Sequence, residues 1–168
     1  AYGMDPLSQG FQDSLSMVGP LYLPEDHPDV VNAKFDTRID QMIWGIGQYS
    51  ATFNEGELFA PDKYLTDYYT DEALKVIENN KNRPFFLYLS HWAIHNPLQA
   101  LRSDVEQMRH MEGHNLQVYS GMIAALDRSV GKVVQKLKEL DIHGKTMIIF
   151  TSDNGGANYI ELDDINKP

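Results

Sequence analysis

The fold is indicated most strongly by one stretch, Lys145-Thr-Met-Ile-Ile-Phe-Thr-Ser-Asp-Asn-Gly-Gly156. Residues 146–150 form an apolar run without polar alternation, which is typical of a strand buried on both faces. The run leads into Asp153 and Asn154, and two glycines follow that allow the backbone to turn. Ligands of open α/β sheets bind at this end of the strands, and carboxylate and amide oxygens suit Ca²⁺ or Mg²⁺. A plain turn is the alternative, because Asp, Asn and Gly are ordinary turn residues.

A second buried strand is predicted at Phe85-Phe-Leu-Tyr-Leu-Ser90. Two histidines, His91 and His95, follow this strand directly, and Pro97 fixes the turn after them. A single histidine here would favour a structural role. Two histidines at the end of a buried strand are equally consistent with a binding site.

The residues around these two strands predict crossover helices. Thr66 is the predicted N-cap of a helix over residues 67–79, and apolar residues at helical spacing predict a long helix over residues 116–140. Gly144 is expected to end the long helix in a left-handed conformation. Strands that alternate with crossover helices pair in parallel, so we predict a three-layer α/β/α sandwich with a mostly parallel sheet. The polar loops that follow the two predicted strands would then lie at the same edge of this sheet.

Other parts of the chain carry weaker signals. Residues 1–63 are rich in proline and glycine and are expected to be irregular, and residues 101–115 are expected to form a polar surface loop with one helical turn. His110 and His114 are four residues apart, but no third ligand accompanies them, so we do not predict a metal site there. Asp127 and Arg128 are expected to be solvated or to make contacts within the fold.

Composition excludes several classes of function. The chain of 168 residues is 42% hydrophobic and 23% charged, which is typical of a globular domain. A net charge of −10 without a basic cluster argues against a nucleic-acid partner. The absence of cysteine excludes disulfides, zinc–thiolate sites and thiol catalysis within the chain. No apolar run approaches the roughly 20 residues that span a membrane.

Two stretches resemble the sulfatase family of the alkaline-phosphatase-like superfamily. They are Arg83-Pro-Phe-Phe-Leu-Tyr-Leu-Ser-His-Trp-Ala-Ile-His-Asn-Pro-Leu98 and residues 148–156, and residues 119–131 look like the helix that the family places between them. The resemblance covers residues 64–156 in the expected order and residues 1–63 only loosely. It implies one partial catalytic domain over residues 1–168, with substrate-side loops in residues 1–63 and an α/β core segment in residues 64–168.

The resemblance also implies a chemistry, the hydrolysis of sulfate esters by a formylglycine nucleophile beside Ca²⁺. By motif, Asp153 and Asn154 would be calcium ligands, and His95 would be the catalytic and substrate-binding residue that contacts the sulfate group. Phosphatases and mutases of the superfamily tend to carry Asp-His where this chain has Asp153-Asn154. Because an amide oxygen favours calcium and a nitrogen ligand favours zinc or manganese, Asn154 favours a sulfatase. His91 lies outside the motif and is expected to be structural or to support the site.

Several family motifs are absent from this sequence. They are the Cys/Ser-x-Pro-x-Arg nucleophile motif, the paired aspartates of the calcium site, the Lys-x-His segment and a later lysine. The family places these motifs before and after the region present here. We therefore expect an internal fragment that is inactive alone and that acts with the remainder of a parent sulfatase chain.

The resemblance suggests a sulfated small molecule or carbohydrate as substrate and a periplasmic or secreted location. Two alternatives stay open. One is a phosphodiesterase or phosphonate hydrolase of the same superfamily, and the other is a non-catalytic domain that binds through its acidic surface.

Overall fold

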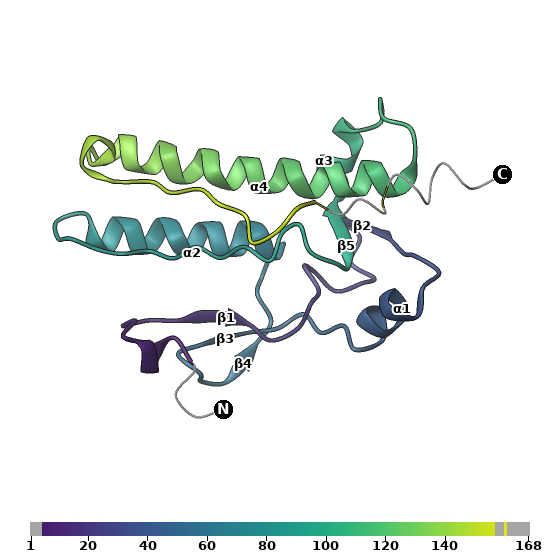
Figure 1. The fold of residues 1–168 in the computed structure, drawn as a ribbon, viewed down its shortest axis with the longest axis horizontal. Helices are drawn as coiled ribbons and strands as arrows, with labels where there is room; N and C mark the ends of the chain where they lie inside the picture. Colours follow the sequence, from purple (N-terminus) through teal and green to yellow (C-terminus); the bar gives the residue numbers. More distant parts are fainter. Residues whose placement is uncertain (1–4, 157–159, 161–168) are drawn as a thin grey trace.

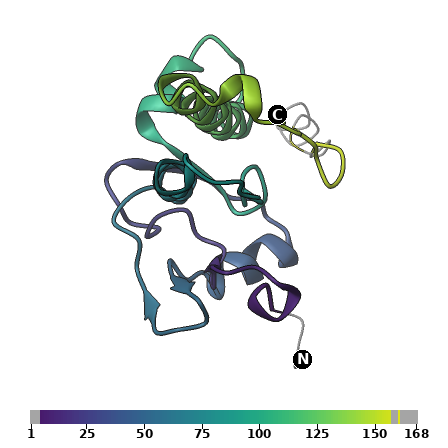
Figure 2. The same cartoon turned by 90° about the vertical axis from the view of Figure 1, so that its left-hand side faces the viewer.

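The computed structural model describes residues 5–156 and residue 160 of the chain. Figures 1 and 2 show the long helix α4 lying alongside α2, with a small sheet and α1 on the other side of α2. The elements in chain order are η1 (Leu7–Gln9), β1 (Leu15–Met17), β2 (Val30–Ala33), α1 (Arg38–Gly45), β3 (Ala51–Phe53), β4 (Leu58–Phe59), α2 (Leu65–Asn80), β5 (Leu98–Leu101), α3 (Arg102–Gln107), α4 (His114–Glu139) and η2 (His143–Lys145).

The long helix α4 forms because its apolar side chains recur at helical spacing, as the sequence predicts. Its buried side chains include Val118, Met122 and Ala125, which join the main core. The helix approaches β5 closely at Gly121, where an added Cβ would lie 3.2 Å from the Cβ of Ala100. Any larger side chain at Gly121 would push α4 away from β5.

Two predicted helix ends differ from the observed ones. Thr66 is not the N-cap of α2, because the helix begins at Leu65, Tyr64 is the N-cap and no side chain caps it. The left-handed residue after α4 is Asp141, with φ of 56°, and not Gly144. The chain turns back at once there, since Ile142 N donates to Leu137 O, so the left-handed position falls before the glycine. Aspartate is among the non-glycine residues that tolerate this conformation.

The sheets of the described residues are small and antiparallel. Strands β1, β3 and β4 form one sheet, and β2 pairs with β5 in another. Residues 1–63, expected to be irregular, supply four of these five strands. The buried side chain of Gln99 in β5 fixes the loop before β2, because its Oε1 accepts from Tyr22 N and Leu23 N at 2.8 Å each.

The parallel sheet expected to contain residues 85–90 and 146–150 is not seen in the part of the chain that the structure describes. Neither segment is a paired strand there, and all three ladders are antiparallel. Many of the apolar side chains are exposed instead of buried, with Phe86 at 77% and Ile149 at 79%, although Leu89 packs against the main core. A parallel strand needs neighbours at its edges and cover on both faces, and the described residues provide these segments with no paired neighbour and only partial cover.

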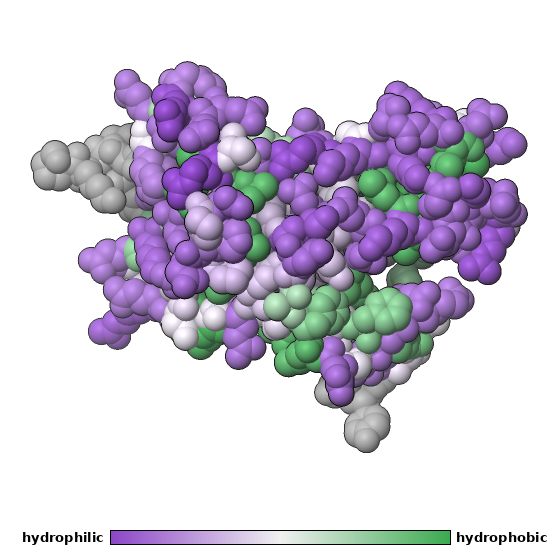
Figure 3. All heavy atoms as spheres, turned by 180° about the vertical axis from the view of Figure 1, so that it is seen from behind, coloured by the Kyte–Doolittle hydropathy of each residue, from purple (hydrophilic) through white to green (hydrophobic). Residues whose placement is uncertain are grey.

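The main core lies where α2, α4 and β5 meet. Its buried side chains include Tyr64, Leu65, Leu98, Val118 and Met122. Among the helices of the described residues, none combines the length and apolar character needed to cross a membrane. The face seen in Figure 3 is largely hydrophilic over the helices, and apolar side chains gather on it toward the three-stranded sheet.

Candidate active site

The loop after residues 85–90 places His95 at the surface, beside an aromatic partner. The rings of Trp92 and His95 have their centroids 4.0 Å apart, and His95 N donates to Trp92 O at 2.9 Å. The buried hydroxyl of Tyr22 lies 2.9 Å from His95 O and 3.1 Å from Trp92 O. Trp92 Nε1 donates to Pro20 O at 3.2 Å. The loop is therefore held from inside while the imidazole of His95 stays exposed.

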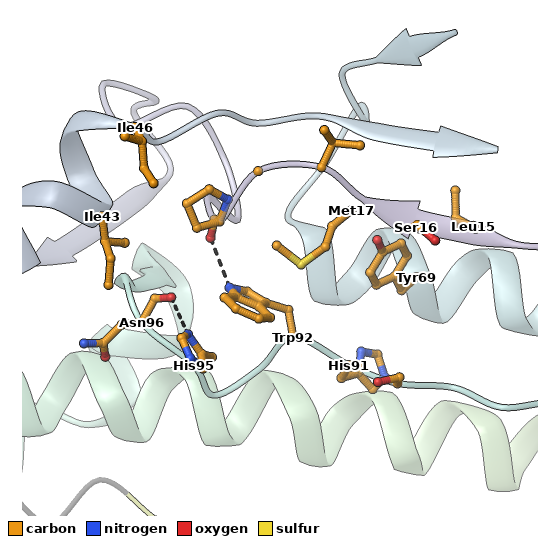
Figure 4. Close-up of a pocket in the computed structure, with 14 residues that line it drawn as sticks. Leu15, Ser16, Met17, Ile43, Ile46, Tyr69, His91, Trp92, His95 and Asn96 are labelled. Carbon is orange, nitrogen blue, oxygen red and sulfur yellow. Dashed lines mark hydrogen bonds between the residues drawn. The ribbon is translucent and has the colours of Figure 1, made fainter. Parts of the chain in front are cut away.

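One hydrogen bond defines the protonation pattern of His95. Its Nδ1 lies 2.7 Å from Asn96 O, drawn as a dashed line in Figure 4. A carbonyl oxygen only accepts, so Nδ1 carries the hydrogen. The other nitrogen, Nε2, then has a lone pair in the neutral ring and a hydrogen in the imidazolium. Nε2 of His95 is thus the atom available for a bound group.

His91, four residues earlier, has a different environment. Its Nε2 lies 2.8 Å from Ser129 Oγ on α4, and Ser129 Oγ lies 2.6 Å from Thr70 Oγ1 on α2. Burial lowers the pKa of His91 to about 4, although the charge of Asp67 opposes this shift. His91 is therefore neutral at pH 7 and joins the loop to both helices. This is the structural environment that the sequence analysis expects for it.

A pocket of about 600 Å³ opens beside these histidines (Figure 4). Residues 15–20 form one wall, and the loop that carries His91, Trp92 and His95 forms the opposite wall. Most of the lining is apolar, and its side chains include Leu15, Met17, Ile43, Ile46 and Tyr69. Residues before position 63 thus contribute to the pocket that His95 borders, and the substrate-side role expected of them stays a prediction.

Asp153 and Asn154 lie on an exposed loop after residues 146–150. Ser152 Oγ donates to Asn154 O at 2.6 Å, and this hydrogen bond closes a local turn. An added Cβ at Gly156 would lie 3.2 Å from Tyr119 Oη, so the loop passes close to α4. Within residues 5–156, no hydrogen bond or ion pair joins Asp153 or Asn154 to His95. A joint site of these three residues stays a prediction.

Other candidate residues have roles in the fold. His114 Nε2 lies 2.9 Å from Asn32 O, and His110 Nδ1 lies 3.1 Å from Gln107 O. Because both partners are carbonyls that only accept, these nitrogens carry hydrogens and are not free to bind a metal. Searched over its described part, the chain holds no group of three acidic or histidine side chains suited to a metal ion.

Sequence reasoning missed the importance of Trp92 and Tyr69. Tyr69 occupies the apolar face of α2, where a tyrosine reads as an ordinary core residue. Trp92 stands between the two histidines in the sequence, and this position is the only local signal of its role. Tyr69 and Trp92 line the same pocket together with residues 15–17, which are distant from both in the sequence. No local sequence signal indicates this meeting.

Comparisons with known proteins identify the family of the chain. The family model described as Sulfatase matches residues 8–162. An N-acetylgalactosamine-6-O-sulfatase of Bacteroides thetaiotaomicron is 27% identical over 159 residues, which are 90% of this chain and 28% of that protein. An N-acetylgalactosamine-6-sulfatase of Mus musculus is 41% identical over 96 residues, or 55% of this chain and 17% of that protein.

A solved structure has a similar arrangement of the backbone over most of this chain. It is the crystal structure of Ps i-CgsB in complex with k-i-k-neocarrahexaose, with a TM-score of 0.66 and 27% identity over 84% of this chain and 32% of that chain. The likeness confirms the expected alkaline-phosphatase-like α/β class. The chain spans less than a third of the length of each of these three proteins. Because the family model matches nearly all of it, the chain belongs to the sulfatase family.

Proposed function

We propose that this chain is part of a calcium-dependent sulfuric ester hydrolase whose formylglycine nucleophile lies outside the chain. The observation that carries the proposal is His95, which presents Nε2 at the edge of a pocket inside a region that matches the sulfatase family. The remainder of a longer sulfatase would complete the site.

His95 would bind the sulfate group through Nε2. Since Nδ1 is committed to Asn96 O, donation from Nε2 requires the imidazolium form. A positively charged donor stabilises an anionic sulfate, and more so as charge grows on its oxygens in the transition state. The Asn96 carbonyl also orients the ring, so His95 needs little rearrangement when the ester binds.

The residues proposed for calcium fit a hard cation. The side chains of Asp153 and Asn154 are exposed, and the described residues offer them no hydrogen-bond partner, so their oxygens are available as ligands. When bound, Ca²⁺ would supply Lewis-acid stabilisation of the sulfate oxygens. Two ligands are too few for Ca²⁺, which takes roughly six to eight oxygens, so the remaining ligands would come from the rest of the protein.

The two exposed apolar segments support a longer protein. Met147, Ile149 and Phe150 are 73–85% exposed, and Phe86 and Tyr88 are 70–77% exposed. Contiguous exposed apolar surface of this kind marks an interface. We propose that strands from the remainder of the parent chain cover residues 85–90 and 146–150.

Sulfated carbohydrate is the substrate class that we propose. The relatives are named as N-acetylgalactosamine-6-sulfatases, and the similar solved structure holds a neocarrahexaose. A pocket with an aromatic wall beside His95 has the character of a carbohydrate site. For the location we propose the periplasm or secretion, as the family resemblance implies.

The direct test compares two esters that differ only in the transferred group. The complete protein that carries this chain is assayed with an aryl sulfate and the matching aryl phosphate, in the presence of Ca²⁺ or Zn²⁺. We expect much faster hydrolysis of the sulfate with Ca²⁺. Faster phosphate hydrolysis sustained by Zn²⁺ would contradict the proposal and favour a phosphodiesterase-type enzyme, and no hydrolysis of either would favour a binding domain.

A further inference from the structure

We infer that Tyr69 and Trp92 form a subsite that recognises a hydroxyl-bearing sugar ring, so that the Tyr69 hydroxyl selects sugar sulfates over aryl sulfates. The inference rests on the proposed function and adds the residues that determine specificity. It starts from polar atoms that the fold leaves unpaired at one pocket.

Tyr69 lies in the second turn of α2 and is only 8% exposed. Its ring contacts Tyr68, but its buried hydroxyl has no hydrogen-bond partner among the described residues. Burial raises the pKa of this hydroxyl, so it stays neutral and able both to donate and to accept. An unpaired buried hydroxyl is unfavourable, and a ligand hydroxyl would remove this penalty.

A second unpaired atom borders the same pocket. His91 Nδ1 is buried and also lacks a partner among the described residues, because the bond to Ser129 uses Nε2. Burial keeps His91 neutral, so Nδ1 presents either a hydrogen or a lone pair and no charge. Hydroxyl groups of a sugar can both donate and accept, so a sugar hydroxyl can pair with either atom. An unsubstituted aromatic ring can satisfy neither.

The apolar part of the pocket suits the face of a sugar ring. The indole of Trp92 lies between His95 and Met17, and Met17 lies between Trp92 and Tyr69 (Figure 4). Methionine is flexible, so its side chain can move aside and open the way to the Tyr69 hydroxyl. A ring seated on Trp92 would have its sulfate toward His95 and a hydroxyl toward Tyr69.

The experiment compares Tyr69→Phe with the unchanged protein in the complete enzyme. A panel of sulfated mono- and disaccharides identifies the best sugar substrate, and phenyl sulfate is the reference. We expect kcat/KM for the sugar to fall about tenfold, the effect of one neutral hydrogen bond. The value for phenyl sulfate should not change. The melting temperature should stay the same or rise, because the variant loses an unpaired buried hydroxyl.

Tyr68→Phe is the matched control. Tyr68 is the neighbouring tyrosine on α2, but it packs against Phe59 and does not line the pocket. This variant should leave both substrates unaffected. Equal losses on both substrates in Tyr69→Phe, no loss on the sugar, or a lower melting temperature would overturn the inference.

The two proposals fail in different ways. If the unchanged enzyme hydrolyses phenyl sulfate but no sugar sulfate, the sugar subsite is wrong and the sulfatase function stands. If it hydrolyses no sulfate ester at all, the proposed function is wrong, and the subsite is overturned with it.

Discussion

Arg128 on α4 holds the buried carboxylate of Asp104 on α3 through two parallel hydrogen bonds. Nη1 lies 2.7 Å from Oδ1, and Nη2 lies 2.9 Å from Oδ2. The same guanidinium reaches Asp67 on α2 at 3.2 Å. These charges pull the pKa of Arg128 further above its ordinary value. The contact joins α2, α3 and α4, and it confirms that Arg128 makes contacts within the fold.

We predict that Arg128→Met lowers the stability of the complete protein by about 3–5 kcal/mol, because Asp104 would stay buried without its partner. Denaturant unfolding gives the value. Arg109→Met is the control, since Arg109 pairs with Glu106 at the surface and such pairs contribute about 0–1 kcal/mol. Similar losses in the two variants would show that the buried contact is no stronger than the exposed one.

A pH dependence of stability follows from His91. Burial lowers its folded pKa to about 4 from an unfolded value of 6.5, so the unfolded chain binds more protons between these values. Stability is therefore complete above pH 6.5 and is lost as the pH falls toward 4. The expected loss from His91 is about 2 kcal/mol between pH 7 and pH 5.

The measurement is unfolding at the two pH values in the unchanged protein and in His91→Gln, which has no titrating ring. The variant should lose about 2 kcal/mol less on acidification than the unchanged protein does. An identical acid response in both proteins would show that His91 titrates normally.

Asp153→Ala tests the proposed calcium ligand. We predict that the complete protein loses its Ca²⁺-dependent activity and keeps its melting temperature without calcium, because the side chain is exposed and contributes nothing to the core. Asp127→Ala is the matched control, an exposed carboxylate on α4 that should leave activity intact. Loss of folding in Asp153→Ala would instead make Asp153 a structural turn residue.

The parts of the fold that depend on local sequence were predictable. The apolar spacing of α4 predicts residues 116–140, and the helix extends from His114 to Glu139. Strand β2 was not predictable, because it pairs with β5 across 64 intervening residues through contacts that no short window contains. Residues 85–90 and 146–150 have the composition of buried strands, but burial needs partners that the described residues do not supply.

In the candidate site, too, local sequence predicts some features, and others depend on contacts between distant residues. The motif distinguishes His95 from His91, and the structure gives them different environments, one exposed and one buried against Ser129. The sequence cannot show that Ser129 lies beside His91, because the two are 38 residues apart. It also cannot show that Tyr69 and Met17 meet at the pocket that Trp92 borders.

The most direct test of the account is the turnover of His95→Ala beside His91→Ala in the complete protein, with a sulfate ester and Ca²⁺. We predict that His95→Ala lowers kcat by roughly 10²-fold or more at an unchanged melting temperature, the scale expected when one stabilising donor is lost. His91→Ala should lower mainly the melting temperature. A His95→Ala variant that keeps full turnover would contradict the claim that this chain contributes His95 to a sulfatase active site.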